Sequence, residues 1–189
     1  MKLYSIYLMF EDDQFSISGR ETNARVVDRF SLSNGLELPC GLLQQFEFRI
    51  RQCGHETDVL ANNFGWIIAS LRLVRILRES GCNIQTIPLC SNDIPGCKGL
   101  GVYHVVNLLS QANALDKERA EYAVELNDTN TPFIASITKL VLRGDAARKM
   151  LPLFRLSESK GHIIASESVV QRLKQEGIRG IGFDPVRVS

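Results

Sequence analysis

The sequence lacks the long apolar runs and the charge imbalance that mark membrane and nucleic-acid-binding proteins. Its 189 residues carry 22 Lys and Arg against 21 Asp and Glu, a formal net charge of +1. A balanced charge gives no electrostatic basis for a nucleic-acid or membrane partner. The apolar run Leu3–Phe10 is interrupted by polar residues and is followed by Glu11, Asp12 and Asp13. We therefore expect a first β-strand here, no signal peptide, and a cytoplasmic protein.

Catalytic and metal-binding motifs are also missing. The three histidines, His55, His104 and His162, lie far apart in sequence and show no HExxH or zinc-ligand spacing. There is no GxSxG motif, and Gly96–Gly101 lacks the GK[ST] ending of a phosphate loop. The five cysteines, an odd number at irregular spacing, predict reduced thiols. The sequence thus predicts no catalytic residue, no metal and no cofactor.

What the sequence does contain is one stretch in two copies. Gly65–Gly81 and Gly161–Gly177 align without a gap over 17 positions, and eight of these are identical. In each copy a short apolar run, Ile67–Ala69 in the first, ends at a serine suited to cap a helix. The helix ends at a glycine, and a second apolar strand follows. The period is too long for a repeat array, so we interpret the copies as a duplicated strand–helix–strand unit, at about 65–89 and 161–186.

The remaining segments alternate short strands with polar turns. Strands are predicted at Val26–Leu32, Phe46–Arg51, Val102–Leu109, Ala120–Leu126, Phe133–Arg143 and Leu151–Leu156. Loops are predicted at Glu11–Arg25 and Ser91–Gly101. The length suits a single domain over 1–189, with two pseudo-repeated lobes at about 1–100 and 101–189 as an alternative. The predicted fold class is α+β (mixed α/β): a mixed β-sheet packed by a few helices, with the doubled unit within it.

Three groups of charged residues are candidates for contact with a partner. They are Glu11, Asp12 and Asp13 after the first strand, Arg72 and Arg75 on the first repeated helix, and Asp116, Glu118 and Arg119 in a polar turn that Asp116 could cap. The competing interpretation of each group is a solvated surface, because most charge runs are only that. The sole tryptophan, Trp66, is predicted to pack in the core rather than to anchor an interface.

The second half of the chain carries a series of short motifs in a fixed order. They are an apolar strand ending in Asn107 and Leu108, then Leu115 and Asp116 followed by Glu118 and Arg119, the strands Lys139–Leu142 and Phe154–Leu156, and a capped helix ending at Gly177. This order resembles an immunity-protein family of bacterial polymorphic toxin systems, first catalogued as a domain of unknown function. The resemblance is strongest over Gly101–Val186. Where that family tends to have a serine after the charged pair, this sequence has Ala120.

The resemblance implies an antitoxin that binds and neutralises a cognate toxin in the cytoplasm by occluding its active site or substrate path. The toxin would come from a neighbouring cell, for example by type VI secretion in interbacterial competition, or from the same cell. Such a protein needs an interface and is not an enzyme. Two alternatives stay open: a small cytosolic α/β enzyme or ligand-binding protein using His104, Asp116 and Arg119, and an adaptor or chaperone for a secreted effector. The oligomeric state is open as well.

Overall fold

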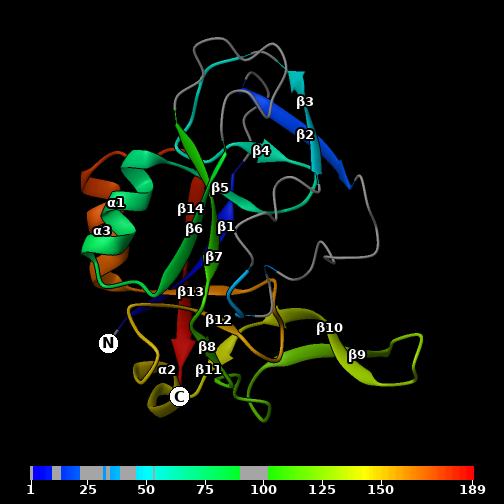
Figure 1. Cartoon of the computed structure of the whole chain (residues 1–189). Helices are drawn as coiled ribbons and strands as arrows, with labels where there is room; N and C mark the ends of the chain where they lie inside the picture. Colours follow the sequence, from blue (N-terminus) through cyan, green and yellow to red (C-terminus); the bar gives the residue numbers. More distant parts are fainter. Residues whose placement is uncertain are drawn as a thin grey trace.

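The structure, a computed structural model, is built from short strands and three helices within the residues that it describes (Figure 1). Those residues are 2–9, 14–21, 32, 35–38, 46–52, 54–89 and 102–189. In chain order the elements are β1 (Leu3–Leu8), β2 (Ser16–Glu21), β3 (Phe46–Gln52), β4 (Ala61–Asn62), β5 (Ile67–Ser70), α1 (Leu71–Glu79), β6 (Ile84–Leu89), β7 (Tyr103–Leu108), β8 (Gln111–Ala112), β9 (Glu121–Leu126), β10 (Pro132–Lys139), β11 (Val141–Leu142), α2 (Gly144–Arg148), β12 (Leu153–Leu156), β13 (Ile163–Ser166), α3 (Glu167–Gln175) and β14 (Ile181–Val188).

Both copies of the repeated unit form a strand, a capped helix and a second strand, β5–α1–β6 and β13–α3–β14. The side-chain oxygen of Ser70 accepts a hydrogen bond from the backbone N–H of Leu73 at 3.2 Å, and the equivalent Ser166 caps α3 in the same way. After the helices, Gly81 and Gly177 have φ of 76° and 62°. This is the left-handed region that glycine occupies at little cost. The predicted caps are confirmed in both copies.

In each copy, a strand from outside the copy lies between the copy's two strands and runs antiparallel to both. β7 lies between β5 and β6 and runs antiparallel to both. β1 lies between β13 and β14 in the same way, and this sheet continues to β11 on one side and to β12 and β8 on the other. β7 follows its copy in sequence, whereas β1 comes from the start of the chain. The two copies are therefore equivalent in space, although their inserted strands occupy different places in the sequence.

Helices α1 and α3 lie side by side and bury their apolar faces in one shared core (Figure 1). Two polar contacts join them. The guanidinium of Arg72 donates to the main-chain oxygen of Glu176 at the end of α3, and Arg172 of α3 pairs with the carboxylate of Glu79. Each contact joins one helix to the other at the protein surface, so these side chains add to the shared core in linking the two copies.

A separate sheet with the order β3–β2–β4 packs against a second core that contains Trp66. The Trp66 ring stacks on Phe64 with centroids 4.6 Å apart, which confirms the predicted core role. Strand β2 corrects the prediction of a loop over Glu11–Arg25. Its one large apolar residue, Ile17, is buried while serines flank it. Pairing with β3 stabilises this strand despite the weak local pattern.

The strand predicted at Phe133–Arg143 is also corrected, because the chain changes partners within it. β10 pairs antiparallel with β9, whereas β11 pairs parallel with β14. The strands form four sheets within the described residues rather than one, but the α+β class holds, since the chain is mostly β with a few helices. The predicted loop Ser91–Gly101 lies outside the described residues, as does Val26–Leu32 except for Leu32.

Candidate partner-binding surface

The hairpin of β9 and β10, which we call the arm, projects away from the other sheets (Figure 1). Among the described strands, β9 and β10 pair only with each other. Both outer edges of the arm therefore lack a strand partner in this part of the chain. A two-stranded ribbon is marginal in stability on its own, and a free edge is where a partner's strand adds to a sheet. The arm has the geometry of an interaction element.

The strand register gathers apolar side chains on one face of the arm. Directly opposite residues of an antiparallel pair share a face. The apolar face consists of the cross-strand pairs Tyr122–Ile137, Val124–Ile134 and Leu126–Pro132. Val124 is 54% exposed and Leu126 is 63% exposed. The face is thus only partly covered by the rest of the chain.

Hydrogen bonds within the arm hold its two ends. At the tip, Oδ1 of Asn127 accepts from the backbone N–H groups of Thr129 and Thr131, at 3.0 and 2.8 Å. At the base, the ammonium of Lys139 lies 3.0 Å from the carboxylate of Glu121. A preorganised element loses less conformational entropy when it binds.

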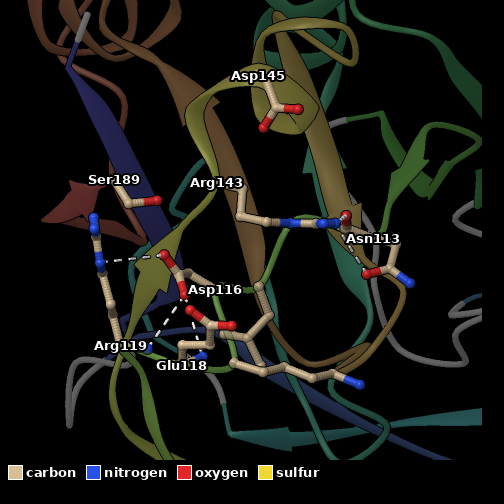
Figure 2. Close-up of a pocket in the computed structure, with 9 residues that line it drawn as sticks. Asn113, Asp116, Glu118, Arg119, Arg143, Asp145 and Ser189 are labelled. Carbon is tan, nitrogen blue, oxygen red and sulfur yellow. Dashed lines mark hydrogen bonds and ion pairs between the residues drawn. The ribbon is translucent and has the colours of Figure 1, made fainter.

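The turn that leads into β9 lines an open hollow of about 640 Å³, which we call the charged hollow (Figure 2). Its lining residues are Asn113, Leu115, Asp116, Lys117, Glu118, Arg119, Arg143, Asp145 and Ser189. Three acidic and three basic side chains are among them. This balance suits several separate ion pairs with a protein surface better than the binding of one anion or one cation.

Asp116 organises this turn. Its Oδ1 accepts hydrogen bonds from the backbone N–H groups of Glu118 and Arg119, both at 3.2 Å, and its own N–H donates to the main-chain oxygen of Val141 at 2.9 Å. Hydrogen bonding with Ser189, followed by the two hydrogen bonds from the turn, holds the pKa of Asp116 below its ordinary value. Nε of Arg119 lies 3.9 Å from Oδ2 (Figure 2). The ionised carboxylate therefore fixes the positions of Glu118 and Arg119, which confirms its predicted capping role.

Arg143 and Asp145 form another wall of the charged hollow. The Arg143 guanidinium donates to the main-chain oxygen of Asn113, and its backbone N–H donates to the oxygen of Ala114 at 2.8 Å. Asp145 stands in the first turn of α2. Figure 2 shows Arg143 extended across to Asn113, with Asp145 above it. These contacts fix the positions of charges on the side opposite the Asp116 turn.

Two further hollows follow in series, each sharing a lining residue with the one before it. One, of about 400 Å³, lies against the apolar face of the arm and shares Lys117 with the charged hollow. We call it the arm hollow. The other, of about 930 Å³, shares Phe133 with the arm hollow, and we call it the apolar groove. The apolar groove is lined by Ile6, Tyr7, Leu8, Phe64, Gly65, Ile67, Asn127, Phe133, Arg155, Lys160, Gly161 and Ile163. The three hollows thus adjoin one another around the arm.

The structure brings together three of the predicted partner residues and places two others elsewhere. Asp116, Glu118 and Arg119 all line the charged hollow. Arg72 and Arg75 lie on α1 and line a different hollow on that helix. Arg72 is engaged with the end of α3, and Nε of Arg75 lies 4.0 Å from the carboxylate of Glu79. Glu11, Asp12 and Asp13 lie outside the described residues.

The enzyme alternative needs His104, Asp116 and Arg119 in one site, and the structure does not bring them together. His104 stands on β7 between Ala69 and Pro88 and does not line the charged hollow. Burial, with a smaller contribution from a nearby arginine, lowers the pKa of His104. Across the described ranges, no cluster of His, Cys, Asp and Glu side chains is arranged to hold a metal ion. In the same part of the chain, no helix is long and apolar enough to cross a membrane.

Comparison with family models identifies the chain. The model of the immunity protein family Imm11 matches residues 38–188. The chain belongs to the Imm11 family. The match includes both copies, the arm and every lining residue of the charged hollow except Ser189, and it starts well before the segment Gly101–Val186 that shows the resemblance best. Comparison with curated proteins gave no match. Membership in Imm11 indicates a role in immunity to a toxin.

Sequence reasoning missed two parts of this surface. The alternation of Tyr122, Val124 and Leu126 signals a strand with one apolar face, but not that the face is left partly uncovered. Arg155 is the single charge in the apolar segment Leu151–Leu156. This lone charge in an otherwise apolar strand was the signal in the sequence that could have indicated a functional residue.

Proposed function

We propose that this Imm11 protein binds a cognate toxin in the cytoplasm and neutralises it by covering the toxin's active site or substrate path, without catalytic chemistry of its own. The observation that carries the proposal is the Imm11 match over residues 38–188. A stable inhibitory interface buries about 1,600 Å² in total, or about 800 Å² on each partner. To keep free toxin scarce, the dissociation constant should be about 1 nM or lower, near −12 kcal/mol.

We propose the arm and the charged hollow as the main toxin contact. Protein interfaces combine an apolar centre with a polar, charged rim. The exposed side chains of Val124 and Leu126 offer such a centre, and Lys117, Glu118 and Arg119 lie beside it as the rim. The tight turn at Asp116 supports this role, because a backbone already held in one conformation loses little entropy on binding.

The other charged groups are proposed as secondary contacts. Arg72 and Arg75 flank the exposed side chain of Leu71 on α1, which gives a smaller patch of mixed character. Asp12 and Asp13 are proposed to steer a basic toxin, and steering acts on the association rate. Reversal of both charges then lowers the association rate at low salt. An unchanged rate removes them from the interface.

The proposal is tested with the toxic domain encoded beside this chain's gene. The domain is induced in cells with and without this protein, and growth and co-purification are measured. The expected result is restored growth together with a complex that survives purification. A toxic domain from an unrelated system serves as the control and should remain lethal. If the protein is folded and expressed but neither rescues growth nor co-purifies with any neighbouring toxin, the proposed function is refuted.

A further inference from the structure

The apolar groove lies where the starts of the two copies meet. Gly65 and Ile67 of the first copy line it together with their equivalents in the second, Gly161 and Ile163. Phe133 of the arm lines it as well. The groove is therefore built from the duplicated scaffold and from the arm.

Arg155 places a buried positive charge in the wall of this groove. It stands on β12 opposite Ile163 and is only 9% exposed. Its Nη1 donates to the main-chain oxygen of Lys160, whereas its buried Nε has no hydrogen-bond partner among the described residues. Burial lowers the pKa of Arg155 to about 10. A buried guanidinium with an unused donor destabilises a folded chain, so the stability of the free protein does not explain it.

The groove itself supplies no counter-ion within the part of the chain that is described. Its lining contains the basic residues Arg155 and Lys160 and no acidic residue. We propose that the groove receives a carboxylate side chain of the toxin, presented on an apolar segment, and that Arg155 binds this carboxylate. The inference rests on the proposed function and adds the chemistry by which the toxin is recognised.

The guanidinium geometry favours a carboxylate. Arginine presents parallel N–H groups that match the two oxygens of a carboxylate. Because Nη1 already donates to Lys160, the edge formed by Nε and Nη2 is the one left for this pair. Once the toxin covers the groove, its apolar walls, including Ile163 and Phe133, exclude water and strengthen the attraction. The same walls suit apolar neighbours of the acidic residue. The charge that destabilises the free protein then stabilises the complex.

The first test compares Arg155→Met with Arg148→Gln, which removes an equal charge from an exposed position on α2. Each variant is titrated calorimetrically with a catalytically inactive form of the toxic domain. Arg155→Met is expected to bind about tenfold more weakly or worse, and Arg148→Gln to stay within about twofold of the unchanged protein. Melting of the free proteins checks folding. If Arg155→Met does not fold, Arg155→Lys replaces it, because lysine keeps the charge but loses the two-point geometry. A folded Arg155 variant with undiminished affinity overturns the inference.

A double-mutant cycle then identifies the partner group. Each exposed Asp and Glu of the toxic domain is changed to its amide. One change should weaken binding to the unchanged protein as much as Arg155→Met does, and should cause no further loss when combined with it. If none behaves in this way, the inference is wrong.

The outcomes separate this inference from the proposed function. If the protein neither binds nor neutralises the toxin, both the proposed function and the groove site are refuted. If the toxin binds with the same affinity when Arg155 is replaced, only the groove site is refuted. Two other occupants are checked at the same time. A dimer in sedimentation that Arg155→Met dissociates, or an apolar acid retained by the free protein in native mass spectrometry, would overturn the assignment to a toxin carboxylate.

Discussion

Replacing Val124 and Leu126 by threonine is expected to weaken toxin binding and to leave the fold intact. Both side chains lie on the apolar face of the arm, and both are more than half exposed. Complete burial of a Val or Leu side chain contributes about 1.5–3 kcal/mol. Because about half of each side chain is still exposed in the free protein, its burial against the toxin should contribute about 1 kcal/mol to binding. A loss of about 2 kcal/mol corresponds to a roughly 30-fold higher dissociation constant.

Threonine is chosen because it has the β-branched shape that strands prefer, which it shares with Val124. The free energy of unfolding should therefore change by no more than about 0.5 kcal/mol, as is usual for exposed positions. Affinity is measured by calorimetry, and unfolding by urea titration. Val102→Thr is the matched control, because Val102 is 60% exposed and lines none of the three hollows around the arm. If the double variant is folded and binds the toxin as tightly as Val102→Thr, the arm is not part of the interface.

Three other predictions concern stability. Ser70→Ala and Ser166→Ala should each lower the free energy of unfolding by about 1 kcal/mol in urea titrations, since each removes a helix cap; two neutral results would contradict the cap assignment. Gly177→Val should lower the free energy of unfolding by about 1 kcal/mol or more, because Gly177 has a φ of 62°, and it should not weaken toxin binding. Gly161→Ala should lower the free energy of unfolding by less, because no atom lies near the added Cβ. Equal losses in the two variants would refute this conformational reason. Burial lowers the pKa of His162, so the unfolded chain binds its proton more readily. The contribution of His162 to stability should be fully present above the ordinary histidine pKa and should be lost as the pH falls through and below that value. His162→Gln should reduce this pH dependence, and an unchanged melting profile would contradict the expected linkage.

Local signals in the sequence predicted the duplicated unit well, because caps are local. Ser70 and Gly81 act within one turn of their own helix, so spacing alone was enough to place them. The pairing of the strands was not predictable in this way. β1 takes between β13 and β14 the place that β7 takes between β5 and β6. The residues of β1 alone do not indicate which distant strands pair with it.

The two errors in the strand predictions have the same physical origin. Ile17 is one buried apolar residue among serines, and its strand depends on pairing with β3. At Leu140 the chain stops pairing with β9 and begins to pair with β14, and strand-forming residues on both sides hide this change of partner. In both cases tertiary contacts outweighed the local pattern.

The candidate surface was predictable only where local hydrogen bonding shapes it. Asp116 is an acidic residue at the start of a polar turn, and its bonds to the next residues follow from that position. Whether the apolar face at Val124 is covered depends on how the arm projects, and the isolation of Arg155 depends on which residues line the groove. Neither is a property of a short stretch of sequence.

The most direct test of toxin neutralisation through the arm is a titration of toxin activity with the purified protein. At a toxin concentration above the dissociation constant of the unchanged protein but below that of the double variant, activity should fall nearly linearly and be largely lost near one equivalent of the unchanged protein. The Val124→Thr and Leu126→Thr double variant should require an excess to reach the same inhibition. Full toxin activity at about tenfold excess of folded, unchanged protein would contradict the neutralising role for that toxin. Identical titration curves for the protein and its double variant would contradict the role of the arm.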